Sequence, residues 1–322
     1  MIEISGLTKQ FGNQLAVDDV SFRVEEGEIM GFLGPNGAGK STTMNILTGY
    51  LSATAGTCKV NGIDILENPL EAKRNIGFLP ELPPLYLDMT VKEYLNFIYE
   101  LKGCRFPRAQ HIREICEVVK IGDVYDRLIG NLSKGYRQRV GIAQALIGNP
   151  RVLIFDEPTV GLDPKQIIDI RNLIRMLGKE HTIILSTHIL PEVQAVCDRI
   201  VVINKGKIVA NEKTEDLVTA VDGSRKMIAK IVGPQDDVLK TLKGVAGIRS
   251  VDMLGKRDTD SISYLIESED RVDVRKPLFY TLASKGWPLV GLEGMELNLE
   301  DIFIRLVGEQ QRKGKYAKGG KN

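Results

Sequence analysis

The stretch that most constrains the fold is "GPNGAGKST", residues 34–42. It matches the pattern G-x-x-x-x-G-K-[ST] and lies between an apolar run, Ile29–Leu33, and the helix-like "STTMNILTGYL". In this context small residues let consecutive backbone N–H groups turn inward around a phosphate, and the helix N-terminus adds its positive end. The stretch therefore predicts a strand–loop–helix unit that binds phosphate, rather than an ordinary glycine-rich turn.

The residues of this loop have distinct expected roles toward a nucleotide. Lys40 would reach the β- and γ-phosphates, and the Ser41 hydroxyl would be a ligand of Mg²⁺. The other residues would hold the phosphates mainly through backbone N–H groups, because their small size permits close approach. The predicted nucleotide-binding residues of the loop are Gly34, Pro35, Asn36, Gly37, Ala38, Gly39, Lys40, Ser41 and Thr42.

An acidic pair follows a second apolar run, in "RVLIFDEPT". Asp156 and Glu157 would lie at the carboxyl end of a central strand, where ligands bind in such sheets. Phosphoryl transfer needs a carboxylate that holds Mg²⁺ and a group that orients or activates the attacking water. We therefore expect Asp156 to hold Mg²⁺ and Glu157 to orient or activate the water. The alternative is that the two acids only form a solvated end of the strand.

Length and hydrophobic pattern predict two domains in the 322 residues. We expect residues 1 to about 80 to hold short strands around one helix, and about 88–148 to be a helical subdomain. The apolar runs "RVLIFDE" and "HTIILSTH" fit central parallel strands covered on both faces. Residues 1–220 are therefore expected to form an α/β domain with a largely parallel sheet and a helical insertion.

A smaller α+β domain is expected over residues 225–308. Strands and helices alternate there in the order β-α-β-β-α-β, which is ferredoxin-like, with a last helix at Leu299–Val307. Trp287, the only tryptophan, is expected to pack rather than bind a ligand. Residues 309–322 form a basic, glycine-containing segment that we expect to be a flexible tail.

Composition limits the partners that the chain could have. The formal net charge of +1 gives no strong electrostatic field that would favour nucleic acid or a membrane as a partner. No apolar run approaches the roughly 18–20 residues of a membrane helix, and the N-terminus does not resemble a signal peptide. Four scattered cysteines without a C-x-x-C pair fit reduced thiols in the cytosol. Any membrane role would therefore depend on a partner.

A second candidate phosphate-binding stretch, "LSKGYRQRV", begins at residue 132. With it, five motifs occur in order: GPNGAGKST, LSKGYRQRV, LIFDEP, GLDP and LSTH. By this set, residues 1 to about 216 resemble the ATP-binding subunit of ABC transporters. "PTVGLDP" and "NLEDIFIRL" most resemble the exporter branch called ABC-2 type, and within it the gliding-motility-associated ATP-binding subunit. The resemblance implies an ABC ATPase, that is, a P-loop NTPase fold that hydrolyses ATP with Mg²⁺.

The resemblance implies further site residues. Phe11 would stack on adenine, and His188 would contact the γ-phosphate and help to hold the water activated by Glu157. Ser133 and Gly135 would contact the γ-phosphate of an ATP bound by another subunit, and Asp163 would lie in the loop that crosses to that subunit. Asp163 could also cap the helix that begins at Pro164. We interpret His111 and His181, which lack such context, as surface residues.

The chain departs from the family pattern at three positions. Glu81 stands where a glutamine is usual; it could be a ligand of Mg²⁺, with like-charge repulsion toward Asp156 and Glu157, or it could face away and serve only the contact with the membrane subunit. In the usual L-S-G-G-Q stretch, Lys134 replaces the first glycine and Tyr136 the glutamine. Whether Lys134 attracts ATP stays open at this point.

The implied assembly has two ATP-binding domains, from a second copy or a paralogue, packed head to tail on a transmembrane permease. The chain would then be a peripheral protein on the cytoplasmic face of the membrane. The alternatives are a soluble ABC ATPase that acts on the ribosome or DNA, a different P-loop enzyme such as a small-molecule kinase, and a regulatory module without turnover. A paired ATP domain, a long coiled-coil insertion or a basic stripe would favour the first alternative, and the sequence has none of these.

Overall fold

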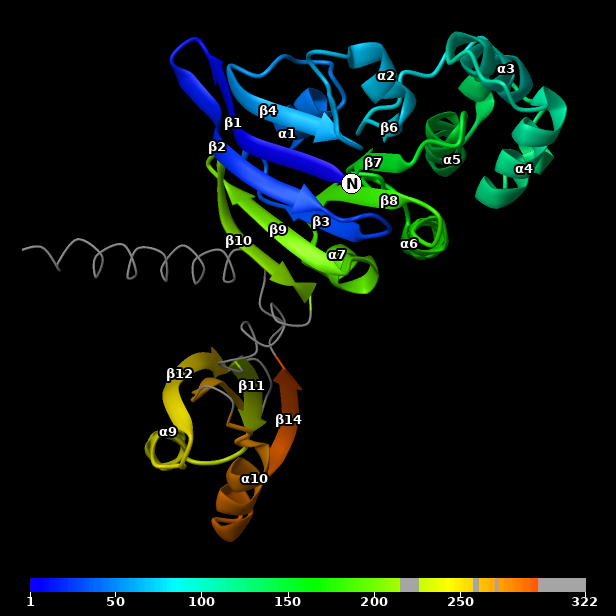
Figure 1. The fold of residues 1–322 in the computed structure, drawn as a ribbon. Coiled ribbons are helices and arrows are strands. Elements are labelled where there is room, and N and C mark those ends of the chain that lie inside the picture. Colours follow the sequence, from blue (N-terminus) through cyan, green and yellow to red (C-terminus); the bar gives the residue numbers. More distant parts are fainter. Residues whose placement is uncertain (215–225, 257–260, 270–271, 295–322) are drawn as a thin grey trace, which may run out of the picture. The chain divides into compact units, whose positions relative to one another are not determined.

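The computed structural model describes residues 1–214, 226–256, 261–269 and 272–294. The chain divides into two compact units, Met1–Thr214 and Glu215–Asn322 (Figure 1). Each unit is described by itself below.

An antiparallel sheet with the strand order β2-β1-β4-β5 opens the first unit. Its strands are β1 (Ile2–Phe11), β2 (Gln14–Val24), β4 (Ala55–Val60) and β5 (Ile63–Asp64). Along β2 the buried residues alternate with exposed ones, as expected for a sheet with one face on the core. β1 and β2 form a long hairpin, so the expectation of short strands in this region was wrong.

A second, largely parallel sheet carries the candidate site. Its order is β10-β9-β3-β8-β7-β6, and only β10 pairs antiparallel within it. The three central strands are buried along their whole length, which explains their continuous apolar sequences. The strands of this sheet are β3 (Ile29–Leu33), β6 (Ile76–Leu79), β7 (Val152–Asp156), β8 (Thr182–Thr187), β9 (Arg199–Asn204) and β10 (Lys207–Lys213).

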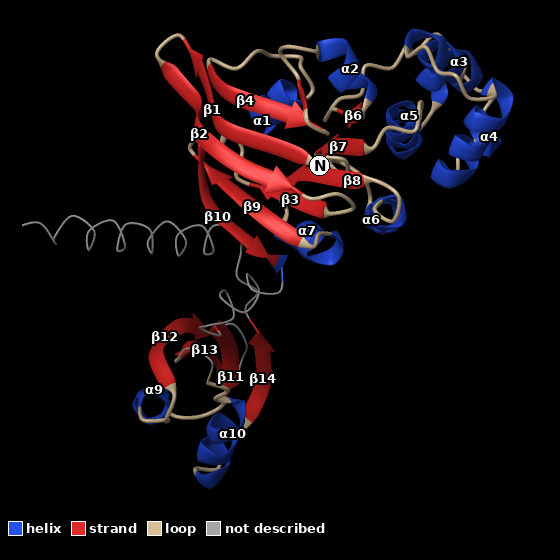
Figure 2. Ribbon diagram, in the orientation of Figure 1, coloured by secondary structure: helices blue, strands red, loops and turns tan. Residues whose placement is uncertain are grey.

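The helices of the first unit fall into two groups (Figure 2). Those near the sheets are α1 (Lys40–Leu47), α2 (Pro69–Arg74), α6 (Pro164–Leu177) and α7 (Leu190–Val196). The second group is α3 (Val91–Leu101), α4 (Arg108–Val119) and α5 (Lys134–Leu146), of which α5 packs against β6. The short 3-10 turns η1 (Gly122–Val124) and η2 (Ile129–Asn131) lie between α4 and α5. Helix α2 corrects the expectation of one helix in the first eighty residues: six residues give too short a pattern to detect.

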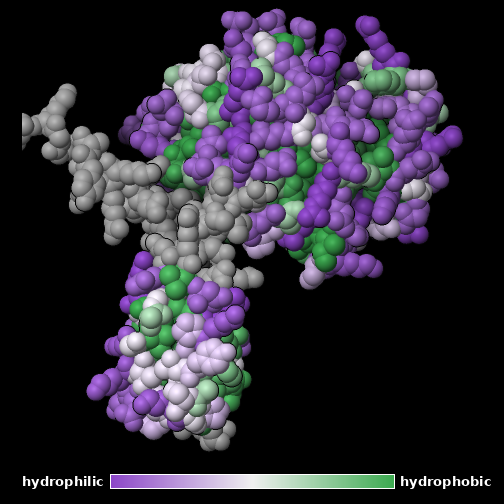
Figure 3. Space-filling model, turned by 60° about the horizontal axis from the view of Figure 1, so that its bottom comes forward, coloured by the Kyte–Doolittle hydropathy of each residue, from purple (hydrophilic) through white to green (hydrophobic). Residues whose placement is uncertain are grey.

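The core of the first unit joins both sheets. Side chains of β1, such as Ile2 and Leu7, belong to one buried cluster with Phe32 of β3 and with Met44 and Leu47 of α1. This cluster fixes α1, and with it the loop that precedes it, against the carboxyl end of β3. In Figure 3 hydrophilic side chains cover most of the visible face of this unit, with apolar ones showing between them.

The second unit has an antiparallel sheet in the order β12-β13-β11-β14, with two helices. Its elements are β11 (Lys226–Ile231), α9 (Gln235–Lys243), β12 (Ile248–Lys256), β13 (Ile262–Ser268), α10 (Arg275–Ser284) and β14 (Leu289–Gly294). This is the ferredoxin-like order expected from the sequence. Trp287 packs against its core, as expected. The predicted helix at 299–307 and the basic tail lie outside the described residues.

No helix within the described part of the chain is long and apolar enough to cross a membrane. All four cysteines are free thiols, and three of them, Cys58, Cys116 and Cys197, are buried.

Candidate nucleotide-binding site

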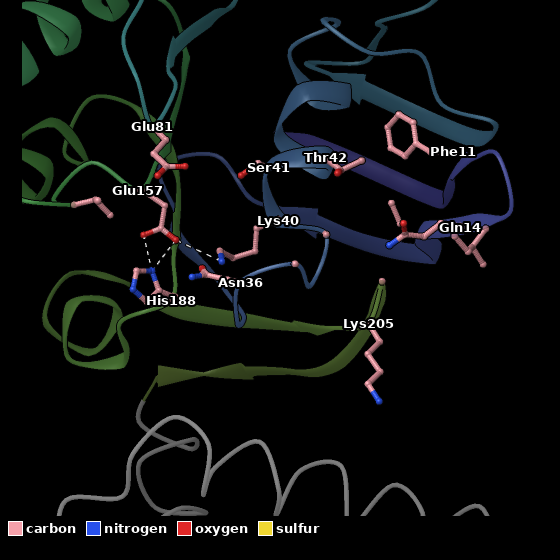
Figure 4. Close-up of a pocket in the computed structure, with 16 residues that line it drawn as sticks. Phe11, Gln14, Asn36, Lys40, Ser41, Thr42, Glu81, Glu157, His188 and Lys205 are labelled. Carbon is pink, nitrogen blue, oxygen red and sulfur yellow. Dashed lines mark hydrogen bonds and ion pairs between the residues drawn. The ribbon is translucent and has the colours of Figure 1, made fainter.

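A cavity of about 820 Å³ opens at the carboxyl end of the parallel sheet, beside the phosphate loop (Figure 4). The β1–β2 hairpin, the loop with α1, the ends of β7 and β8, and the β9–β10 turn all contribute to its walls. The cavity is lined by Phe11, Gln14, Leu15, Ala16, Asn36, Gly37, Gly39, Lys40, Ser41, Thr42, Glu81, Glu157, Val160, His188, Lys205 and Gly206.

The phosphate loop connects β3 to α1, as its sequence predicts. Gly37 and Gly39 have φ values of 77° and 110°, conformations that favour glycine. At Gly34 a Cβ atom would lie 2.5 Å from the carbonyl oxygen of Ile203, so a side chain cannot be accommodated there without moving β9. These glycines therefore determine the shape of the loop, and they also let a phosphate approach its backbone N–H groups.

Lys40 is buried with its ammonium directed back into the loop. Its Nζ donates to the carbonyl oxygens of Gly34 (2.8 Å) and Pro35 (3.3 Å). It also lies 3.4 Å from Oε1 of Glu157, and both side chains are 6% exposed. A buried ammonium held in this way supplies positive charge at the point where the loop would receive phosphate.

Glu157 contacts two of the residues singled out in the sequence. Besides Lys40, it faces His188, whose Nδ1 lies 2.9 Å from both carboxylate oxygens (Figure 4). The backbone of Glu157 has φ 50°, which is uncommon for a residue other than glycine, and its N–H donates to the carbonyl of Ser186 (2.8 Å). The end of β7 thus turns sharply and directs this carboxylate at the cavity.

Asp156, one residue earlier, is buried, and its Oδ1 has no hydrogen-bond partner among the described residues. Burial raises the pKa of the Asp156 carboxyl, and the charge of Glu157 adds to the rise. The hydroxyls of Ser186 and Ser41 and the charge of Lys40 lower it in part. An unpartnered buried carboxylate oxygen beside a hydroxyl is the kind of donor set that a hard cation such as Mg²⁺ uses.

Glu81 follows β6 and lines the cavity, so the alternative that it faces away is wrong. Figure 4 shows its carboxylate near Glu157 and Ser41. Like-charge repulsion acts on Asp156 from Glu157, whose negative charge contributes to the raised pKa of the Asp156 carboxyl. Within the described residues no cluster of three or more His, Cys, Asp and Glu side chains forms a metal site by itself. One or two carboxylates with a hydroxyl still suit Mg²⁺, which keeps water and phosphate oxygens as further ligands.

Phe11 lies at the other end of the cavity, at the last position of β1. Its ring is 48% exposed, and the ammonium of Lys9 lies 5.1 Å from the ring centroid. A half-exposed aromatic face at a cavity rim suits stacking against a flat base. The phosphate loop and this ring thus lie at opposite ends of one cavity (Figure 4).

The second stretch that the sequence predicts to bind phosphate lies elsewhere in the unit. Ser133 is the N-cap of α5, and its Oγ accepts from the N–H of Tyr136 (3.4 Å). Gly135 is buried against α6: a Cβ atom there would lie 2.7 Å from the Gln166 side chain. Asp163 caps α6 by accepting from the N–H of Gln166 (2.9 Å). Gly135 and Asp163 line a separate cavity of about 340 Å³ with Tyr136.

Comparison with known proteins identifies the family and the fold of the chain. The model of the ABC transporter family matches residues 17–160. The bacitracin transport ATP-binding protein of Bacillus licheniformis is 32% identical to this chain over 310 residues, which are 96% of the chain and 97% of that protein. The chain belongs to the ABC transporter ATP-binding proteins. A Nod factor export ATP-binding protein of Burkholderia orbicola is also 32% identical to this chain; the match covers 97% of this chain and 98% of the Burkholderia protein.

Solved structures agree with this assignment. One is the ATP-binding subunit of an ABC transporter, which is 29% identical to this chain with a TM-score of 0.62. The match covers 67% of this chain and 91% of the solved one. A dimeric post-hydrolysis state of an ATP-binding cassette, bound to ADP and Pi, covers 66% at 27% identity and a TM-score of 0.61, with 99% of it matched. The first unit is therefore an ABC ATPase of the P-loop NTPase fold, and it binds ATP.

Some cavity residues of this ABC ATPase were not predicted from the sequence. Gln14 is the first residue of β2, and Lys205 lies in the β9–β10 turn; the tertiary fold brings both to the cavity, and no motif marks them. The histidine predictions were wrong at two positions. His111 is buried, stacks on Phe106 and accepts from the N–H of Gly148 (3.0 Å), and His181 is buried with Nδ1 2.8 Å from the carbonyl of Pro150.

Proposed function

We propose that this chain is the ATP-hydrolysing subunit of an ABC exporter, which binds MgATP at a head-to-tail dimer interface and drives export through a separate membrane subunit. The observation that carries the proposal is the position of Glu157, held between Lys40 and His188 at the wall of the cavity. A carboxylate so placed can accept a proton from an attacking water. His188 can fix the orientation of that carboxylate, and Lys40 can neutralise charge on the phosphates.

Mg²⁺ fits the residues at the phosphate end of the cavity. Ser41, Asp156 and Glu81 offer a hydroxyl and two carboxylates, and the unpartnered Oδ1 of Asp156 supports a cation there. When bound, Mg²⁺ would neutralise charge that develops on the β- and γ-phosphates. The role of these three residues as ligands is part of the proposal.

A second ATP-binding subunit is proposed because one chain presents two incomplete sites. The 820 Å³ cavity is lined by the phosphate loop, whereas Gly135 and Asp163 line the other cavity. Head-to-tail packing would place Ser133 and Gly135 of one subunit against the ATP held by Lys40 of the other. A similar cassette has been solved as a dimer with ADP and Pi, which supports this arrangement.

Export through a permease is proposed from the relatives and from the surface of the helical segment. Two relatives carry bacitracin transport and Nod factor export in their names. Tyr86 and Phe97, in contact at 5.5 Å between ring centroids, and Leu101 are exposed around α3. Exposed apolar side chains grouped in this way suit a protein contact. The chain would then lie at the cytoplasmic face of the membrane, and the narrower resemblance to the gliding-motility-associated subunit stays a prediction.

The Glu157→Gln variant tests the catalytic assignment. We expect it to abolish steady-state ATP hydrolysis, because an amide cannot take the proton of the water, and to leave dimers that form with MgATP. Size-exclusion chromatography with and without MgATP measures the second effect. The exposed Glu180→Gln is the matched control and should hydrolyse ATP normally. A Glu157→Gln chain that stays monomeric and binds no nucleotide would contradict the assignment.

Purification from membranes tests the transport role. The tagged chain should co-purify with a membrane protein of several apolar spans, identified by mass spectrometry. Isolation with ribosomes or DNA instead would favour the alternative of a soluble ABC ATPase.

A further inference from the structure

A buried carboxylate outside the cavity connects the end of β8 with the loop after β7, next to the candidate catalytic residues His188 and Glu157. Glu192, in the first turn of α7, is 1% exposed. Its Oε1 accepts from the hydroxyl of Thr159 (2.6 Å), and its Oε2 accepts from the hydroxyl of Thr187 (3.0 Å). Arg171 of α6 lies farther away, with Nη2 3.7 Å from Oε1. The two threonine hydroxyls therefore lie closer to the Glu192 carboxylate than the Arg171 guanidinium does.

Thr187 is the last residue of β8 and directly precedes His188. Its hydroxyl donates to Glu192 and accepts from the N–H of Ile189 (3.1 Å), so it is hydrogen-bonded to the residue that follows the histidine. Its carbonyl accepts from the N–H of Gly34 (3.4 Å), the first residue of the phosphate loop. The direction of His188 therefore depends on a residue whose side chain Glu192 fixes.

Thr159 lies two residues after Glu157. Its carbonyl accepts from the N–H of Leu162 (3.2 Å), and the N–H of Val160 donates to the carbonyl of Glu157 (3.3 Å). These bonds shape the loop between Glu157 and Asp163. Glu192 thus connects this loop with the end of β8, and Arg171 adds the helix that Asp163 caps.

A buried carboxylate is costly unless it is hydrogen-bonded, and apolar residues often stabilise a core as well or better. Stability alone therefore gives a weak reason for Glu192 at this position. Its two oxygens hold two separate loops at a fixed separation, which apolar packing would hold less specifically. Such support fixes the distance and direction between the side chains that the loops carry.

We propose that Glu192 is a positioning residue for ATP hydrolysis, which keeps His188 and Glu157 opposed by binding Thr187 and Thr159; this inference rests on the proposed function. In Glu192→Gln the shape stays, but one acceptor oxygen becomes an NH₂ donor. One of the two threonine hydroxyls then loses its acceptor and must reverse its bond or turn away. The separation of the two loops is no longer fixed.

The experiment measures ATP turnover and ATP affinity for the wild type, Glu192→Gln and Thr187→Val. The matched control is Thr182→Val, which removes another buried hydroxyl from the opposite end of β8, where it accepts from the N–H of Gly27 (3.0 Å). We expect kcat to fall roughly 10- to 100-fold in the first two variants, since small displacements of a reacting group have effects of that size. The Kd for ATP should change less than about threefold.

Thr182→Val should keep the kcat of the wild type. Unchanged kcat in both Glu192→Gln and Thr187→Val would overturn the inference, as would an equal loss in Thr182→Val. A loss of turnover that follows a loss of ATP affinity would overturn it too. If Glu192→Gln does not fold, Thr187→Val carries the test, because it leaves the carboxylate with Thr159 and Arg171. Absence of hydrolysis in the wild type would instead refute the proposed function.

Discussion

At the scale of single residues, Lys40 is buried beside the phosphate loop, so it should contribute more to ATP binding than an exposed lysine would. Lys40→Ala should weaken ATP binding roughly 10- to 100-fold, because a hydrogen bond to a charged group contributes about 1.5–3 kcal/mol. The measurement is fluorescence titration with an ATP analogue. Lys205→Ala is the matched control: Lys205 lines the same cavity on the β9–β10 turn, and its side chain points away from Lys40 (Figure 4). Equal affinities for wild type and Lys40→Ala would contradict the site.

The candidate site could be predicted at residues that belong to local motifs. The phosphate loop, the acids after β7 and His188 after β8 each have a fixed sequence context, and the fold brings all of them together. Glu192 could not be found in this way, because its partners come from separate segments of the chain. Lys205 could not be found either, because only the tertiary fold brings its turn to the cavity. His111 and His181 were misplaced for the same reason: packing between distant segments buries them.

At the scale of elements, β6 and α5 pack so closely that only glycine fits at position 77. A Cβ atom on Gly77 would lie 2.3 Å from the carbonyl oxygen of Ala145, a backbone atom that cannot turn aside. Gly77→Ala should therefore lower the free energy of unfolding by about 1–3 kcal/mol, the usual cost of overpacking. Urea unfolding measures the change. Gly122→Ala, where no atom lies within 4 Å, is the control, and equal stability of the two variants would refute the argument.

A lysine joins the end of α3 to the end of α5. The Nζ of Lys102 donates to the carbonyls of Gln144 (3.1 Å), Ala145 (3.3 Å) and Ile147 (2.7 Å). Burial lowers the pKa of Lys102 to about 8. Between pH 8 and its ordinary value near 10.5, the unfolded chain therefore binds more protons at this group than the folded chain does, so stability rises with pH.

The wild type should therefore gain stability relative to Lys102→Met as the pH rises from 8 to 10, by at most about 1.4 kcal/mol per pH unit. Urea unfolding of both proteins at pH 7, 8, 9 and 10 gives the difference. Lys92→Met, an exposed change on α3, controls for the general effect of pH. A difference that stays flat or falls above pH 8 would contradict this prediction.

The elements with long or continuous patterns could be predicted, and the short ones could not. β7 and β8 follow from unbroken apolar runs, and the order of the second unit follows from its alternating pattern. α2 was missed, and α10 begins at Arg275 after Val274, which makes no side-chain cap bond. Helix ends depend on caps and neighbours, which one sequence shows poorly. The long β1–β2 hairpin depends on pairing, which the pattern of one strand does not reveal.

At the scale of the whole molecule, the two units have separate hydrophobic cores. The core that supports the phosphate loop belongs to the first unit, and Met227, Tyr264 and Leu278 belong to that of the second. Every residue lining the 820 Å³ cavity lies before Thr214. The described residues that would contact nucleotide in this cavity therefore all belong to the first unit.

MgATP should accordingly stabilise one thermal transition and leave the other unchanged. A ligand at 100 times its Kd stabilises the state that binds it by about 2.7 kcal/mol, which corresponds to roughly 5–10 °C for a unit of this size. Differential scanning calorimetry of the full chain, with and without MgATP, measures both transitions. Lys40→Ala should show a smaller shift at the same ATP concentration. Equal shifts in both transitions would mean that the accessory unit is coupled to the nucleotide site, and its removal should then alter ATP hydrolysis.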